Sequence, residues 1–165
     1  MFLKFIFGIG IIAFTSFCGY FFSKKYRQRK LFLRQLKEFN ERFLSEISYY
    51  RRPIGEFATA YFYKGEFQNF LQTYFAEIDE LSQNLEKTVA FDDCEFLNDE
   101  EKSVITDYFK MLGKGDSASQ KLYFSAAKER LAKLQASAEN DCKKYGDLYV
   151  KLGFLFGLFV LILMI

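Results

Sequence analysis

The chain has 165 residues, which favours a single domain, and its formal net charge is only +2. Hydrophobic residues make up 50% and aromatic residues 20%, but there is no histidine. The lack of histidine excludes Ser-His-Asp and Cys-His catalysis and the usual mixed zinc sites. Cys18, Cys94 and Cys142 have no paired spacing, so we expect reduced thiols packed as small residues rather than a disulfide framework.

The first predicted element is an apolar segment near the amino terminus. No charged side chain occurs between Phe5 and Phe22, a run of about 18 residues that is long enough to span a bilayer. A cleaved signal peptide is the alternative. The apolar core exceeds a typical signal core, however, and no A-x-A-like cleavage site follows. The pattern therefore favours an uncleaved transmembrane helix over residues 1–23.

The central region, residues 24–144, has helical periodicity. Apolar residues step by three and four from Phe32 to Tyr50, which predicts one long helix that continues from the first span and ends before Pro53. Pro53 suits the first turn of a second helix, and Gly65 interrupts it. A third helix is expected from Phe67 to Leu85, followed by a loop at 88–97.

The next two helices meet at the stretch "LGKGDSASQ", residues 112–120. Asn98 and three following acidic residues are typical of a helix start, and Gly113 of a helix end. Asp116 or Ser117 then caps the next helix, with a capping box predicted between Ser117 and Gln120. That helix has no proline and is expected to run on into the last apolar segment.

The carboxyl-terminal apolar run, Leu152–Ile165, has 14 residues. As a helix it measures about 21 Å, which is short against a bilayer core of about 30 Å. Extended upstream to Tyr145, it becomes long enough, with Lys151 snorkelling and Tyr145 and Tyr149 at the interface. The alternative is a buried helix end of a soluble core. We expect a second transmembrane helix at 145–165.

The charges predict the orientation of these two spans. The basic residues that flank them are Lys24, Lys25, Arg27, Arg29, Lys30, Lys143 and Lys144. They place the 24–144 domain in the cytoplasm and both termini on the opposite side. No segment alternates with a period of two. The predicted fold is therefore all-α: a cytoplasmic helical bundle between N-terminal and C-terminal transmembrane helices.

The charge is uneven along the chain. Residues 24–52 hold ten Lys or Arg and three Asp or Glu, net +7, whereas residues 53–112 hold four and thirteen, net −9. The basic segment suits positive-inside orientation and anionic headgroups. The acidic segment is either a solvated face or a surface for a basic partner.

Two chemical interpretations of the sequence are disfavoured. "LGKGDSASQ" is a variant of a dinucleotide-binding fingerprint, but no strand precedes it and no acidic residue follows at the required distance; it does not fit a P-loop either. The acidic groups in "FDDCEF" and "NDEEK" could ligate Mg²⁺ or Ca²⁺, but helix capping explains "NDEEK". We expect no metal or cofactor.

The Gly153-x-x-x-Gly157 step in the last apolar segment suggests close helix packing. Gly8 and Gly10 in the first span are the expected counterpart.

Three stretches resemble the stage III sporulation protein AB family: "FLSEISYYRRPIGEFA", "LGKGDSASQ" and the terminal "KKYGDLYVKLGFLFGLFVLILMI". Their order and spacing cover essentially the whole length. The positions that match the family's pattern are Glu46, Tyr49, Pro53, Glu56, Leu112, Gly113, Asp116 and Gln120. The chain departs from the pattern in lacking tryptophan, and in having Ile54 and Phe57 where leucine and alanine are usual.

The resemblance implies a function and partners. Such proteins are membrane components of the channel complex between mother cell and forespore, and their cytoplasmic domain is similar to domains of the type II secretion F protein. The implied partners are a secretion-type ATPase, stage III sporulation protein AA, and other membrane proteins of the channel, in the mother-cell membrane around the forespore. No nucleic acid and no catalysis are implied. The eight matching positions and the acidic segment are the candidates for partner binding.

Two other classes of protein stay open from the sequence. A membrane-active hairpin, such as a pore-former or toxin, has the same two apolar segments. A membrane-bound enzyme using carboxylates and a metal is the second alternative, although the lack of histidine counts against it.

Overall fold

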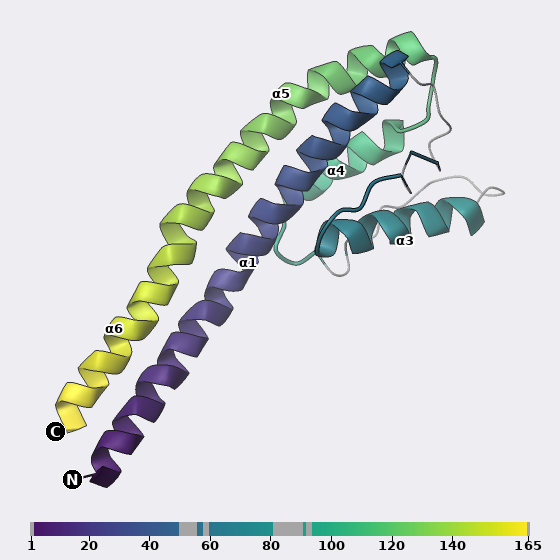
Figure 1. Ribbon diagram of the computed structural model, residues 1–165. Coiled ribbons are helices and arrows are strands. Elements are labelled where there is room, and N and C mark those ends of the chain that lie inside the picture. Colours follow the sequence, from purple (N-terminus) through teal and green to yellow (C-terminus); the bar gives the residue numbers. More distant parts are fainter. Residues whose placement is uncertain (1, 50–55, 58–59, 81–90, 92–93, 165) are drawn as a thin grey trace. The chain divides into compact units, whose positions relative to one another are not determined.

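In the computed structural model, the backbone is described for residues 2–49, 56–57, 60–80, 91 and 94–164, and side chains for 8–48, 56–57, 60–76, 91 and 94–163 (Figure 1). The described elements are helices α1 (Phe2–Tyr49), α3 (Glu66–Glu80), α4 (Asp99–Met111), α5 (Ser117–Asp141) and α6 (Asp147–Met164), with a π-helical turn, η1 (Cys142–Gly146), before α6. No strand occurs in these residues, which confirms the all-α class. Contacts divide the chain into two compact units, residues 1–30 with 137–165, and residues 31–136.

The unit of residues 31–136 is built around one face of α1. Phe32, Leu36, Phe39 and Phe43 are at most 3% exposed, as their helical spacing predicts. The three phenylalanine rings pack against aromatic side chains of the other helices of this unit. Phe32 packs edge-on against Phe67 of α3, with ring centroids 5.1 Å apart. Such pairs stabilise a core by about 0.5–1.5 kcal/mol each beyond area burial, which gives the many phenylalanines of the chain a structural role.

Buried hydrogen bonds join the helices of the same unit. The Asn40 Nδ2 group of α1 donates to the Phe124 carbonyl oxygen of α5 at 3.2 Å. The Tyr108 hydroxyl donates to Asn40 Oδ1 at 3.0 Å, and the Tyr74 hydroxyl donates to the Phe109 carbonyl oxygen at 2.7 Å. Burial raises the pKa of Tyr74 to about 12 and the pKa of Tyr108 well above its ordinary value. Both phenols therefore stay neutral donors.

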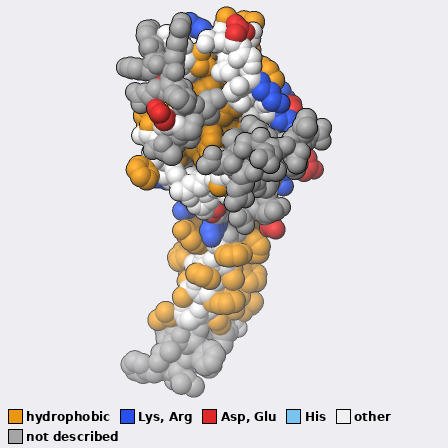
Figure 2. Space-filling view, turned by 90° about the vertical axis from the view of Figure 1, so that its right-hand side faces the viewer, with side chains coloured by type: hydrophobic (Ala, Val, Ile, Leu, Met, Phe, Trp, Pro, Cys, Tyr) orange, Lys and Arg blue, Asp and Glu red, His pale blue; other side chains and the backbone are white. Residues whose placement is uncertain are grey.

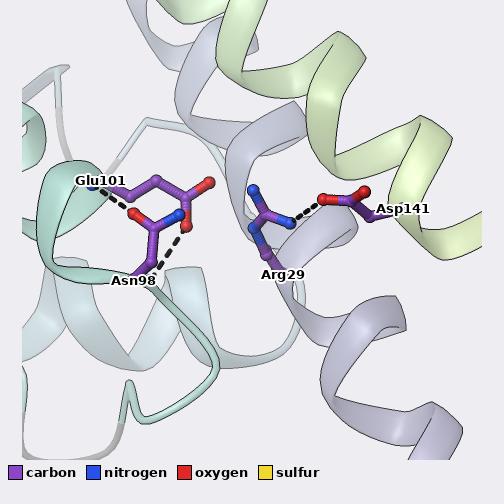
Figure 3. A network of polar contacts seen from close by, with 4 residues as sticks. All are labelled: Arg29, Asn98, Glu101 and Asp141. Atoms are coloured by element: carbon purple, nitrogen blue, oxygen red, sulfur yellow. Dashed lines mark hydrogen bonds and ion pairs between the residues drawn. The ribbon is translucent and has the colours of Figure 1, made fainter. Parts of the chain in front are cut away.

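The ends of α4 show which capping signals the chain uses. Asn98 accepts from the Glu101 backbone N–H at 2.8 Å, and Glu101 Oε2 accepts from the Asn98 N–H at 3.1 Å, a complete capping box (Figure 3). The helix ends before Gly113, whose φ of +77° is costly for any residue with a Cβ. The predicted start and end of this helix are confirmed.

The start of α5 corrects one prediction. Asp116 precedes the helix, and hydrogen bonds from the Ser119 hydroxyl and nearby backbone N–H groups lower the pKa of its carboxyl. Asp116 is therefore the cap, one of the two predicted. The capping box between Ser117 and Gln120 is wrong. The Gln120 amide instead donates back to the Lys114 carbonyl oxygen at 3.2 Å, because Ser117 already lies inside the helix.

The unit of residues 1–30 and 137–165 is a pair of antiparallel helices. α1 begins and α6 ends at the same end of this unit (Figure 1). The helix that starts at Ser117 reaches Leu163 without a break in helical structure, as predicted, but through the π-turn η1. A π-turn holds an extra residue per turn and changes the face that the following helix presents.

The second predicted helix, after Pro53, falls mostly outside the described residues. At its described positions, the Ala60 N–H donates to the Glu56 carbonyl oxygen at 3.1 Å.

Candidate membrane-facing helix pair and partner-binding surface

Glycines set the closest contacts between α1 and α6. A Cβ on Gly153 would lie 2.6 Å from the Thr15 carbonyl oxygen, and one on Gly157 would lie 2.8 Å from the Ile12 Cα. From the α1 side, a Cβ on Gly19 would lie 2.5 Å from the Tyr149 carbonyl oxygen. Each of these is closer than real Cβ atoms approach another backbone. The two helices therefore pack backbone to backbone, which is the geometry that small residues permit.

The four glycines singled out from the sequence have different environments. Gly153 and Gly157 lie in the α1–α6 contact, and Gly8 lies against the Leu161 side chain. No described atom lies within 4 Å of a Cβ built on Gly10. That this packing occurs in a membrane stays a prediction.

Sequence reasoning missed Gly19, the α1 glycine whose Cβ position lies closest to the α6 backbone. A detectable signal was present, because Thr15, Gly19 and Ser23 repeat small residues at every fourth position, as in interfaces of membrane helices. The Thr15 hydroxyl donates to the Ile11 carbonyl oxygen of its own helix at 3.0 Å, so this polar group is satisfied without water.

The outward side of the helix pair is apolar. Large side chains of both helices are at least half exposed to solvent, and Figure 2 shows hydrophobic side chains gathered on this part of the visible face. They include Phe14, Phe17, Phe21, Leu155, Phe159 and Ile162. Among the residues that the structure describes, Ser117–Leu163 is the one helical stretch long and apolar enough to cross a membrane, by length and composition, and only 11% of its most apolar 18-residue segment is buried.

Tyrosines and charged side chains lie at the end of this apolar exterior that is further from the start of α1 and the end of α6. The Tyr26 ring stacks on Tyr145 and Tyr149, with ring centroids 5.7 and 6.0 Å apart. Burial, followed by the neighbouring tyrosines, raises the pKa of Tyr26. Arg29 Nη1 lies 2.6 Å from Asp141 Oδ2, an ion pair between α1 and α5 (Figure 3). Aromatic rings followed by charges are typical of a membrane–water boundary.

The predicted partner-binding residues in the 31–136 unit differ in accessibility. Glu56, Gly113 and Asp116 are exposed, and Gln120 is half-buried. Leu112 and Glu46 are each 4% exposed. The Tyr49 side chain and Pro53 lie outside the described residues. Among the candidate positions that the structure describes, those that a partner can reach are thus Glu56 and the corner of Gly113, Asp116 and Gln120.

A small cavity lies between α4 and α5. It has a volume of about 200 Å³ and is lined mainly by apolar atoms, with Tyr123 and Arg130 as its polar side chains at the surface. Among the described side chains, no group of three histidines, cysteines or carboxylates is placed to hold a metal ion.

The fold and these surfaces define an all-α protein with a helix long and apolar enough to span a bilayer. The sequence pattern of stage III sporulation protein AB matches residues 4–165, and the chain belongs to this family of sporulation proteins. The match extends from the apolar part of α1 to the end of α6, so the resemblance carried by three short stretches is confirmed over nearly the whole chain. No curated protein and no solved structure matches it.

Proposed function

We propose that the protein is a non-catalytic membrane platform of the sporulation channel. In this proposal, α1 and α6 anchor it in the mother-cell membrane around the forespore, and the 31–136 unit docks a secretion-type ATPase in the cytoplasm. Family membership supports the sporulation role. The observation that carries the membrane role is the glycine-packed helix pair with an apolar exterior.

The close α1–α6 contact supports two spans rather than one. A Cβ on Gly19 would lie 3.3 Å from the Gly153 Cα, at the start of the apolar run of α6, and a Cβ on Gly157 would lie 2.8 Å from the Ile12 Cα further along it. A bilayer that surrounds α6 there must surround α1 as well. The exposed side chains Phe14 and Phe17 of α1 suit that surrounding, since each is 67% exposed.

The corner between α4 and α5 supports the docking role. Asp116 is a fully exposed carboxylate, and Leu122, on the exposed side of α5, is 76% exposed. An exposed leucine in the first turns of a helix that begins at an exposed carboxylate is a combination that protein interfaces use, because burial of the apolar group adds affinity and the charge adds specificity.

Co-purification of the full chain with the ATPase partner, stage III sporulation protein AA, tests this proposal. Asp116→Lys and Leu122→Asp together are expected to lower the affinity at least about tenfold, since each removes about 1 kcal/mol or more of interface energy. Lys128→Glu, an exposed charge reversal further along α5, serves as the control. Binding that survives the double substitution in a folded protein would remove the corner from the interface. Absence of binding by the unchanged chain would contradict the platform role.

A further inference from the structure

The cations at the end of the apolar helix pair fall into two groups. Those further from the apolar exterior have carboxylate partners on α5: Arg29 Nη1 lies 2.6 Å from Asp141 Oδ2, and Lys30 Nζ lies 3.8 Å from Glu139 Oε1. The Arg29 side chain is 14% exposed, so that pair is part of the helix packing. These two cations are neutralised within the protein.

The cations about one turn closer to the apolar exterior are different. We call Lys24, Lys25, Arg27 and Lys144 the cationic collar. All four are exposed, and among the described side chains no carboxylate lies within ion-pair distance of them. Three of them lie over tyrosine rings instead: Lys25 over Tyr26, Arg27 over Tyr20 and Lys144 over Tyr145, at 5.0–5.2 Å from the ring centroids.

The collar residues from the two helices lie at the same level of the helix pair. The stacking of Tyr26 on Tyr145 brings the 23–27 and 143–147 segments side by side. Together these two segments contain five Lys or Arg and one carboxylate, Asp147, a net charge of +4. Lys143, the fifth cation, is 69% exposed in its side chain and lies 3.7 Å from Glu139, which Lys30 shares.

The surroundings of the collar indicate the chemistry of its ligand. Phe21, Phe22 and Leu148 are 45–61% exposed and lie next to the collar in sequence on the two helices. A ligand that matches both the cations and the neighbouring apolar side chains is negatively charged where it meets the collar and apolar one helical turn further along. An acidic protein matches the charge but not the apolar exterior, whereas an anionic phospholipid matches both.

We propose that the cationic collar binds the headgroups of anionic phospholipids, so that the protein prefers membrane regions rich in them. The inference rests on the part of the proposed function that places α1 and α6 in the membrane. The ion pairs of Arg29 and Lys30 mark where the headgroup layer ends in this proposal, because these two cations have protein carboxylates in place of lipid phosphates.

Native mass spectrometry of the full chain in a neutral detergent tests the collar. Equimolar phosphatidylglycerol and phosphatidylcholine are offered, and the lipids retained on the protein are counted. At about 0.1 M salt we expect a preference of about tenfold for phosphatidylglycerol, since each collar cation adds attraction to an anionic headgroup. Changing all four collar residues to glutamine should reduce the preference below about threefold.

Two control variants separate charge from folding. Lys110, Lys114, Lys121 and Lys128 are exposed residues of the 31–136 unit, and their change to glutamine removes the same total charge. That variant should keep the full preference. Replacement of the three collar lysines by arginine should also keep it, because the charge is unchanged.

Equal retention of both lipids by the unchanged chain would overturn the collar proposal. An unaltered lipid preference in the variant with four glutamines would overturn it as well. Equal retention would fit an acidic protein partner instead, whereas an unaltered preference would place the lipid site outside the collar. Alkaline extraction of membranes separates this failure from that of the proposed function. If the protein stays in the membrane pellet but shows no lipid preference, only the collar proposal is contradicted. If alkali extracts the protein from the membrane, the proposed membrane platform is contradicted as well.

Discussion

At the scale of single residues, the α1–α6 contact depends on glycines that no larger residue can replace. A Cβ on Gly153 would lie 3.2 Å from the Gly19 Cα as well as close to the Thr15 carbonyl oxygen. Neither neighbour is a flexible side chain that can move aside. The helices must therefore separate when Gly153 gains a side chain.

Gly153→Leu is expected to destabilise the helix pair by about 1–3 kcal/mol, the usual cost of overpacking. Gly10→Leu is the matched control in α1, because a Cβ there meets nothing within 4 Å. Thermal unfolding of the full chain in detergent measures both. Equal melting temperatures for the two variants would show that α1 and α6 do not pack through Gly153.

Tyr74 makes the stability of the 31–136 unit depend on pH in the alkaline range. Its phenol has a pKa of about 12 in the folded protein because it is buried, and about 10 in an unfolded chain. Folding therefore favours the neutral phenol, and this stabilisation is complete below pH 10 and lost as the pH rises towards 12. Tyr108, whose pKa is raised by burial, acts in the same direction.

Tyr74→Phe is expected to lower the free energy of unfolding by about 1 kcal/mol at pH 7, because the hydrogen bond to the Phe109 carbonyl oxygen is lost. Between pH 10 and pH 12 the variant should lose stability less steeply than the unchanged chain. Denaturant unfolding followed by circular dichroism at pH 8 and at pH 11 measures this difference. Identical pH dependences would contradict the assignment of this decline to Tyr74.

At the scale of elements, capping decides where α4 begins. Asn98→Ala removes the acceptor for the Glu101 N–H and is expected to cost about 1 kcal/mol of stability. Ser117→Ala, at the start of α5, should cost much less, because the cap there is Asp116. Reversal of this order in denaturant unfolding would restore the capping box predicted between Ser117 and Gln120.

Helix positions were largely predictable from the sequence because apolar spacing, glycines and proline report on local conformation. Phe32, Leu36, Phe39 and Phe43 follow the helical period and are buried. The choice between Asp116 and Ser117 as the cap of α5 was not predictable, since it depends on which residue the preceding turn leaves outside the helix. The π-turn at Cys142–Gly146 has no local signal either.

The candidate surfaces were predictable only in part. The GxxxG step and the basic flanks are visible in the sequence. The pairing of Arg29 with Asp141, 112 residues away, is a tertiary contact that spacing does not reveal. That no described carboxylate pairs with the collar residues is likewise visible only once the two helices lie side by side.

At the scale of the whole molecule, a membrane anchor and a membrane-active hairpin differ in what they do to the bilayer. In an anchor, the glycine contacts keep α1 and α6 together and their apolar exterior faces lipid. We therefore expect vesicles that contain the full chain to retain an encapsulated dye as well as empty vesicles do. Dye release in proportion to the amount of protein would favour the pore-forming alternative.

The central claim is that two helices cross the membrane and hold the intervening residues in the cytoplasm. Labelling of single cysteines in intact cells with a membrane-impermeant thiol reagent tests it most directly, in a chain whose native cysteines are replaced by alanine. A cysteine at Ser119 should be protected until the cells are permeabilised, whereas a cysteine added at either terminus should react from outside. Labelling of the Ser119 position in intact cells, or protection of one terminus, would contradict the two-span topology.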